Sequence, residues 1–249
     1  MPKSLSTQAV AEYHATGYRF PVAALAASEA LSYLERLEVF IEENGGSKEA
    51  RKLLFEKAHL RCAPLAELVR HEKILDAVED VLGPDILCWA STVFLKEPQD
   101  KAYVSWHQDA MYWGLNPADV VTAWVALTHS GPENGAMQVL SGSHLGALFR
   151  HNDTFAANNM LSRGQEIAVE VDPAKVVMLV LRAGEMSLHH VKLAHGSDAN
   201  RSMNRRIGYA IRYVAPHVRQ TGSKGDRATL VRGIDRFRNF KPEATTEPI

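Results

Sequence analysis

The stretch ILCWASTVFL (residues 86–95) decides the fold class, because the chain changes there from helical to extended character. It is rich in β-branched and aromatic residues, which favour strands. Seven short runs of a similar kind follow, and Gly, Pro, Asn and Asp separate many of them. These runs are residues 102–108, 120–128, 136–140, 167–171, 176–181, 186–190 and 206–214. So many short strands in succession predict a sandwich or a small barrel.

The chain before this stretch has helical periodicity. Apolar residues recur there at spacings of three and four, and glycines end the periodic runs. The expected helices run from a cap at Ser6 or Thr7 to Gly17, from Ser28 to Gly45-Gly46, and over residues 65–82 before Gly83-Pro84.

Helices followed by strands predict an α+β fold. We expect a single domain over residues 1–249, with a helical part at about 5–83 and a strand core at about 86–215. The tail, residues 216–249, is more polar, and its last segment, KPEATTEPI, is expected to be frayed.

Composition limits the classes of function. The 249 residues carry 28 basic and 29 acidic side chains, and this balance favours neither nucleic acid nor a membrane surface as a partner. Cys62 and Cys88 are too few for a disulfide framework, which indicates a reducing compartment. Glu12 and His14 interrupt the position of a signal peptide, and no apolar run is long enough to span a bilayer. These features predict a cytoplasmic protein.

The motif WHQD (residues 106–109) is the first candidate for chemistry. On a strand, alternate side chains share a face, so His107 and Asp109 are expected to point the same way, together with Tyr103 and Ser105. One imidazole and one carboxylate are two thirds of the facial triad that binds iron(II). The alternative is a surface histidine beside an aspartate that begins a loop.

The segment LHHVKLAHGSDANRSMNRRIGYAIRYV (residues 188–214) offers the rest of such a site. His189, His190 and His195 are all candidates for the third ligand, because only one is needed. Arg206 follows His195 by eleven residues, and a planar guanidinium can grip one carboxylate of a dicarboxylic acid. The arginines of this segment are open to a second interpretation as a solvated basic turn.

Strand parity distinguishes Arg206 from its neighbour Arg205. In a strand over residues 206–214, Arg206, Gly208, Ala210 and Arg212 share one face, and Ile207, Tyr209, Ile211 and Tyr213 share the other. Small residues beside Arg206 are expected to leave room for a co-substrate. Arg205 is expected to point to the opposite face.

These motifs, in this order, resemble the phytanoyl-CoA dioxygenase family, a branch of the double-stranded β-helix iron/2-oxoglutarate oxygenases. The resemblance covers residues 8–215 and also includes the opening EYHATGYRFP. Its main elements are WHQD (106–109), TAWVAL (122–127), PENGAMQVLSGSH (132–144) and HGSDANRSMNRR (195–206). It implies a jelly-roll, cupin-like core with N-terminal helices packed on it, and iron(II), 2-oxoglutarate and O2 as cofactor and co-substrates.

The resemblance also implies roles for individual residues. His107, Asp109 and His195 match the metal ligands, and Arg206 and Ser197 match the residues that bind 2-oxoglutarate. Gln108 and Trp124 match positions near the co-substrate, although Trp124 is equally expected as a core aromatic residue. For Asn134-Gly135 we expect only a tight turn between strands.

The resemblance therefore predicts an enzyme that hydroxylates an unactivated C–H bond of a small or medium-sized metabolite while 2-oxoglutarate is decarboxylated to succinate, with ascorbate as the assay reductant. Asp109 argues against halogenation, because halogenating members carry Ala or Gly there. Alternatives are a non-catalytic metal-binding jelly roll, a structural or interaction domain with a dead site, and desaturation or another oxidative outcome at the same iron. The candidate substrate residues are Tyr103, Met111, Tyr112, Trp113 and Arg212. The sequence specifies neither the substrate nor the oligomeric state.

Overall fold

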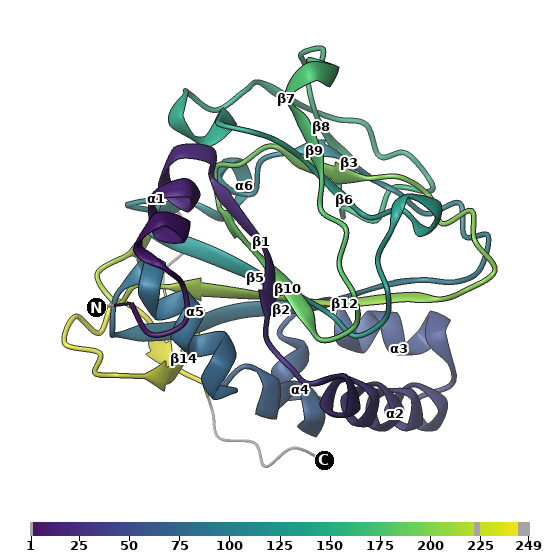
Figure 1. Cartoon of the computed structure of the whole chain (residues 1–249), viewed down its shortest axis with the longest axis horizontal. Helices are drawn as coiled ribbons and strands as arrows, with labels where there is room; N and C mark the ends of the chain where they lie inside the picture. The colour runs from purple at the N-terminus through teal and green to yellow at the C-terminus, as the bar shows by residue number, and fades with distance from the viewer. Residues whose placement is uncertain (1, 222–224, 244–249) are drawn as a thin grey trace.

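Two β-sheets face each other in the computed structural model, which describes residues 2–221 and 225–243 (Figure 1). The larger, here called the main sheet, has the order β1 (Tyr18–Ala23), β10 (Glu185–His190), β5 (Val120–Ala126), β12 (Arg206–Val214), β2 (Ile86–Lys96), β14 (Arg227–Arg232) and β15 (Lys241–Pro242). The small sheet has the order β3 (Val104–His107), β11 (His195–Ser197), β6 (Met137–Leu140) and β9 (Val176–Met178). Two short pairs, β13 (Arg219–Gln220) with β4 (Leu115–Asn116) and β7 (His151–Asp153) with β8 (Gln165–Ile167), complete the described strands.

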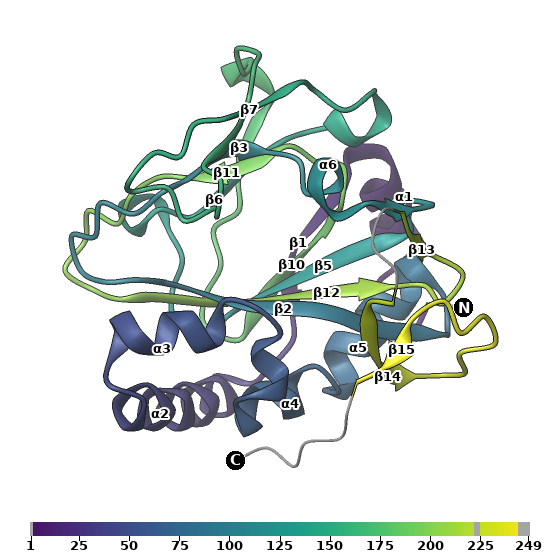
Figure 2. The same cartoon turned by 180° about the vertical axis from the view of Figure 1, so that it is seen from behind.

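The α-helices are α1 (Thr7–Thr16), α2 (Ala27–Glu43), α3 (Ser47–Leu54), α4 (Ala63–Leu68), α5 (Glu72–Leu82) and α6 (Ala110–Trp113). Helices α2 to α5 cover the outer face of the main sheet, below it in Figures 1 and 2, while the small sheet and α6 lie above it. Short 3-10 turns are η1 (Ala58–Leu60), η2 (Pro132–Asn134), η3 (Ser143–Leu145) and η4 (Pro173–Lys175).

The alternation of side chains along β12 joins the helices to the sheet. The residues expected on one face, Ile207, Tyr209, Ile211 and Tyr213, are buried in one apolar cluster with residues of α2, α4 and α5. The hydroxyls of Tyr209 and Tyr213 donate to the carbonyls of Leu65, at 3.3 Å, and Val69, at 3.1 Å. The opposite face of β12, which carries Arg206 and Arg212, is thereby directed toward the small sheet.

The helical part agrees with the sequence in outline but differs in detail. Ser6 caps α1 through a hydrogen bond from the Ala9 amide, and α1 ends at Gly17, which has a left-handed backbone, as expected. Ser28 is not the cap of α2, because Glu29 reaches back to accept from the Ala26 amide at 2.7 Å and the helix starts at Ala27. The single helix expected over 65–82 is two helices, α4 and α5.

Several strands also differ from expectation. The runs 102–108 and 176–181 shorten to β3 and β9, and the run 167–171 is replaced by β8, which ends at Ile167. Helix α3 and strand β1 were not expected. The tail is more ordered than expected, because β14 pairs with β2 and β15 pairs with β14. The frayed end expected from Lys241 onward is therefore wrong for Lys241–Pro242, while residues 244–249 lie outside the described residues.

No helix in the described part of the chain is both long enough and apolar enough to cross a membrane.

Candidate active site

The small sheet brings two histidines and one aspartate together. His107 is the last residue of β3, and its Cα partner on β11 is His195. The two imidazole rings lie 4.2 Å apart between centroids, and Asp109 lies beside them. One ligand atom from each of His107, Asp109 and His195 lies within 4.8 Å of the others, and all three residues are buried.

Asp109 reaches this cluster by a route that differs from the expected one. The strand ends at His107, and Asp109 has helical dihedral angles (φ −56°, ψ −40°) immediately before α6. Strand parity between His107 and Asp109 is therefore not the reason that they meet. The chain turns after His107, and this turn places an Asp109 carboxylate oxygen 3.3 Å from Nε2 of His107.

Backbone carbonyls orient both imidazoles. Nδ1 of His107 donates to the carbonyl of Ser105 at 2.9 Å, and Nδ1 of His195 donates to that of Leu193 at 3.0 Å. These hydrogen bonds leave each Nε2 free to ligate a metal, as is usual for histidine ligands.

The charge state of the cluster suits a divalent cation. Burial, and then the charge of His107, lower the pKa of His195 to about 4, so this imidazole is neutral near pH 7. Burial opposes ionisation of Asp109, but the adjacent imidazoles of His107 and His195 and the charge of Arg212 hold the pKa of Asp109 well below its usual range. A neutral imidazole and an ionised carboxylate are the forms that bind iron(II).

The other two candidate histidines do not join the cluster. His189 is buried, its ring lies 4.9 Å from that of His195, and its Nδ1 has no hydrogen-bond partner within the described residues. His190 packs instead against His144, with ring centroids 5.2 Å apart.

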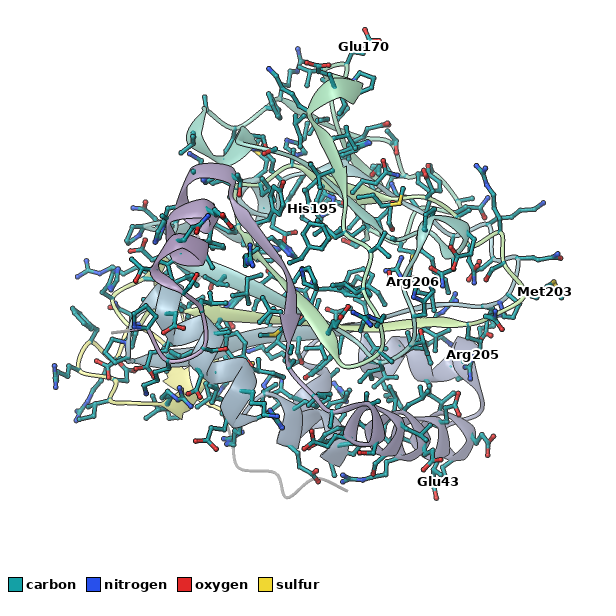
Figure 3. The ribbon with its side chains drawn as sticks, viewed as in Figure 1. Glu43, Glu170, His195, Met203, Arg205 and Arg206 are labelled. Atoms are coloured by element: carbon teal, nitrogen blue, oxygen red, sulfur yellow. The ribbon has the colours of Figure 1, made fainter. Side chains whose placement is uncertain are left out.

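One side of the cluster opens into a small cavity of about 50 Å³, here called the inner chamber. Arg206 lies at this chamber and is only 2% exposed. Its Nη1 donates to the carbonyl of Gly135, whereas its Nε has no partner among residues 2–221 and 225–243. The guanidinium lies 4.9 Å from the ring of Trp124. Figure 3 shows Arg206 on the side of β12 that faces the small sheet.

Arg205 lies on the opposite side of the strand, as expected from parity (Figure 3). It forms ion pairs with Glu38 of α2, at 3.0 Å, and with Glu97, at 3.1 Å. It therefore links the helices to the main sheet and does not reach the inner chamber.

The space above Gly208 has a different use from the one expected. A Cβ atom at this position would lie 1.9 Å from the Trp124 ring, so the indole fills the space that the missing side chain leaves. The small residue therefore makes room for Trp124, which in turn packs on Arg206. The loop at Asn134-Gly135 likewise does more than turn the chain, since the Gly135 carbonyl receives Arg206.

Lys96 is a residue of this region that the sequence reasoning missed. It lies opposite Arg206 in the pairing of β2 and β12 and is fully buried. Its Nζ donates to Oγ of Ser197 at 2.8 Å and also to the carbonyl of Asp198. Burial and the positive charge of Arg206 lower the pKa of Lys96 to about 6. The one signal in the sequence was a lysine at the end of an apolar strand.

The cluster also borders a larger cavity of about 250 Å³, here called the outer chamber. His107, Asp109 and Arg212 belong to the lining of both chambers. Aromatic side chains form much of the outer wall, which includes Trp89, Phe94, Tyr112 and Trp113.

The remaining candidate residues lie elsewhere. Met111 is 47% exposed and, like Tyr103, is not part of the lining of either chamber. Ser105 donates to the carbonyl of Gln165 in the support of β3. The amide of Gln108 is directed to the backbone, where it donates to Lys192 at 2.6 Å and accepts from Phe149 at 2.7 Å.

Two facing sheets that enclose two histidines, one carboxylate and a buried arginine define the class of non-haem metal oxygenases with a jelly-roll fold. A family model described as phytanoyl-CoA dioxygenase matches residues 1–208. The chain belongs to the phytanoyl-CoA dioxygenase family.

Individual relatives agree with this placement. A probable alpha-ketoglutarate-dependent hypophosphite dioxygenase of Stutzerimonas stutzeri is 34% identical over 200 residues, which are 77% of this chain and 68% of that protein. The peroxisomal phytanoyl-CoA dioxygenase of Homo sapiens is 30% identical over 160 residues, 61% of this chain but only 46% of that protein. The solved apo form of the non-heme monooxygenase ThoJ is 36% identical, has a TM-score of 0.84, and covers 96% of this chain and 88% of its own.

These comparisons confirm the family and the fold class that the sequence predicted. The expected cofactor and co-substrates, iron(II), 2-oxoglutarate and O2, are those of this group of oxygenases, and the described residues include a donor set that fits the metal. The chain spans about half the length of the human phytanoyl-CoA dioxygenase that it matches.

Proposed function

We propose that this protein hydroxylates an unactivated C–H bond of a small or medium-sized metabolite, with iron(II) and 2-oxoglutarate. In this reaction one oxygen atom of O2 enters the substrate and the other enters succinate, while 2-oxoglutarate loses CO2. One observation carries the proposal: Arg206, which is buried and has no acidic partner among the described residues, lines the same cavity as the His-Asp-His cluster.

The proposed metal ligands are His107, Asp109 and His195. The bound iron with 2-oxoglutarate supplies the oxidising power, and the protein holds and orients the reactants. The carbonyls of Ser105 and Leu193 fix the two imidazole rings, so the ligand geometry is set before the metal arrives.

Arg206 is proposed to bind the distal carboxylate of 2-oxoglutarate. Its unpartnered Nε can donate to that group, and Trp124 keeps the guanidinium plane in place. Ser197 is proposed to donate its hydroxyl to the same carboxylate. This direction is consistent with the contact of Lys96, whose neutral amine still has a hydrogen to donate to the Ser197 oxygen and so leaves the hydroxyl hydrogen free for the co-substrate.

Gln108 is proposed to act by position, because its side chain holds two loops beside Asp109. Tyr112 and Trp113, which line the outer chamber, are the proposed substrate contacts from the segment after Asp109. Tyr103 and Met111 are proposed to affect the substrate only indirectly, because neither lines the chambers. A cytoplasmic location and a small-molecule substrate complete the proposal.

A non-catalytic metal-binding jelly roll is the competing class. Such a protein has no need for a buried arginine without an acidic partner beside its metal cluster, because an uncompensated buried charge is costly. The combination of Arg206, Ser197 and three ligands at one cavity therefore favours an enzyme.

The test of the class is succinate formation from 2-oxoglutarate by the iron(II)-loaded protein with ascorbate and O2. The wild type is expected to form succinate slowly without a substrate and faster with one. No succinate above the level of the Asp109→Ala variant would contradict the enzyme class.

The reaction outcome is tested on the first substrate that accelerates succinate formation. Mass spectrometry in excess chloride is expected to show a gain of one oxygen atom. A loss of two hydrogen atoms would instead indicate desaturation at the same site. A halogen isotope pattern would contradict the role of Asp109 as a ligand.

A further inference from the structure

We propose that Arg212 binds an anionic group of the primary substrate, in the outer chamber. The inference rests on the proposed function, because it assigns the outer chamber to the substrate and the inner chamber to 2-oxoglutarate. The ligand class is an oxyanion, either a carboxylate or a phosphorus oxyanion, attached to an apolar body.

Arg212 is a buried cation without an acidic partner of its own. It is 9% exposed and donates two hydrogen bonds through Nη1, to Oγ1 of Thr92 at 2.6 Å and to the carbonyl of Ala210 at 3.3 Å. Its Nε has no hydrogen-bond partner, and it forms no ion pair within the described residues. An arginine that is buried in this way needs an anion, because leaving a charge uncompensated inside a protein is costly.

Burial lowers the pKa of Arg212, and the carboxylate of Asp109 is the largest charge that opposes this shift. Asp109 is also the proposed carboxylate ligand of the metal. Once the metal is bound, the carboxylate charge is shared with the cation, and Arg212 loses most of that stabilisation. Loading of the metal therefore increases the need of Arg212 for another anion.

The charges of the loaded site point the same way. The two positive charges of iron(II) and the one of Arg206 are matched by Asp109 and by the two carboxylates of 2-oxoglutarate. Arg212 remains as one unmatched positive charge in the buried site, with Lys96 neutral. Glu56 also lines the outer chamber, but it is exposed and solvated, so it does not neutralise Arg212.

The surroundings of Arg212 hold it in one place. Its guanidinium carbon lies 5.8 Å from the ring of Phe94 and 5.6 Å from the ring of Trp113. Such contacts orient a guanidinium and leave its donor edge available for an oxyanion. The same aromatic side chains provide an apolar surface for the rest of the ligand.

The position along β12 separates the two arginines. Arg206 and Arg212 share one face of the strand but are six residues apart, which is about 20 Å at roughly 3.3 Å per residue. His107 and Asp109 border both chambers. A substrate anchored at Arg212 would therefore reach the metal from a different end of β12 than the co-substrate anchored at Arg206.

The test measures binding without turnover. The protein is loaded with Zn2+, which is redox-inactive, and with saturating 2-oxoglutarate, so that Arg206 is occupied. Calorimetry or ligand-observed NMR then compares phenylacetate with phenylacetamide, which share a skeleton and differ in charge. Phenylphosphonate tests phosphorus oxyanions, and acetate and inorganic phosphate test whether the apolar body matters.

We expect the wild type to bind phenylacetate or phenylphosphonate at least about tenfold more tightly than phenylacetamide. Arg212→Met should bring this ratio close to one, and Arg212→Lys should keep part of it. Arg182→Met is the matched control, because it removes the same charge from an exposed side chain and should leave the ratio unchanged. If Arg212→Met does not fold, Arg212→Lys still tests the proposal. Lysine cannot form the two parallel hydrogen bonds of a guanidinium, so the ratio of acid to amide affinity should fall.

Equal binding of the amide and the acid by the wild type would overturn the proposal, as would an unchanged ratio in the Arg212 variants. Failure of every anionic probe to bind at millimolar concentration would also overturn it. A carboxylate that binds where the phosphonate does not identifies the carboxylate as the oxyanion, and the reverse result identifies a phosphorus oxyanion. Succinate formation is measured separately, so a failure of the proposed oxygenase reaction is distinguishable from a failure of the anion site.

Discussion

The inner and outer chambers meet at the same His-Asp-His cluster, and two arginines from one face of β12 line them: Arg206 lines only the inner chamber, and Arg212 lines both. The inner chamber, of about 50 Å³, has fixed walls, since Trp124 packs on Arg206 and the Gly135 carbonyl holds it. The outer chamber, of about 250 Å³, includes exposed residues such as Phe55 at its rim. The small chamber suits one small co-substrate held by a fixed arginine, whereas the larger, aromatic chamber has the volume and the apolar surface for a bulkier ligand.

The largest effect is expected from the loss of Asp109, which lines both chambers. Asp109→Ala deletes one metal ligand and the charge that balances the cation, so succinate formation should fall to background. The loss should exceed the roughly 10–100-fold that follows removal of an outer-shell partner of a metal site. Metal binding by calorimetry should weaken in parallel. Asp119→Ala, at an exposed aspartate that pairs with His217, should retain both properties.

The second largest effect is expected at Arg206 and distinguishes the function of the inner chamber from that of the outer chamber. Arg206→Ala should raise the KM for 2-oxoglutarate at least about tenfold, because a charge-assisted pair contributes about 1.5–3 kcal/mol. Binding of anions in the outer chamber should not change. Arg205→Ala is the control, and it should keep the KM even if its lost ion pairs with Glu38 and Glu97 reduce stability. An unchanged KM in Arg206→Ala would remove this arginine from the co-substrate site.

A smaller effect tests the packing that distinguishes the inner chamber. Gly208→Ala places a Cβ 1.9 Å from the Trp124 ring, so the indole must move away from Arg206. We expect a loss of about 1–3 kcal/mol in the free energy of unfolding, together with a higher KM for 2-oxoglutarate. Gly146→Ala is the control, since a Cβ there would lie 3.9 Å from the carbonyl oxygen of Ser143 and the φ of Gly146 is −84°. Equal stability of the two variants would show that the ring has room to shift.

The smallest effect concerns Lys96, which lies behind the inner chamber and donates to Ser197 in its wall. Its pKa is about 6 in the folded protein and 10.5 in its ordinary state, so only the unfolded chain holds the proton between these values. Arg206 lowers this pKa, and Asp198 and Asp100 raise it slightly. The free energy of unfolding should therefore rise with pH across this window, by at most about 1.4 kcal/mol per pH unit from this group.

The Lys96→Met variant should lack this rise of the free energy of unfolding with pH. Denaturation of the variant and the wild type at pH 6.5 and 8.5, without 2-oxoglutarate, measures the difference. Lys101→Met, at an exposed lysine, should keep the wild-type slope. The same slope in all three proteins would mean that Lys96 is charged in the folded state.

The family motifs carried much of the site in the sequence itself. The order of WHQD, HGS and the arginine at residue 206 was sufficient to select the residues that the structure brings together. The alternation along β12 was also readable, because the strand is long and regular. Helix ends were readable where a local cap determines them, as at Ser6 and Gly17.

The remaining features depended on contacts between distant segments. Lys96 lies beside the inner chamber through its pairing with Arg206 across 110 residues of sequence, and no local pattern marks such a pair. The break between α4 and α5 coincides with the hydrogen bond from Tyr213 to Val69, which is 144 residues away. The indole of Trp124 fills the space beside Gly208, and this contact also joins distant segments, since β5 and β12 are neighbours only in the folded sheet.

The sequence by itself determined the fold class, the family, and the types of residue at the candidate metal and co-substrate sites, because these depend on periodicity and on short motifs. Only the tertiary structure decided that Asp109 meets His107 through a turn, that Arg212 has no acidic partner among the described residues, and that the cluster divides two chambers. The physical reason is that a cavity and an unpaired buried charge are properties of surroundings. Those surroundings come from strands far apart in the chain, which the sequence does not place next to each other until the sheets have formed.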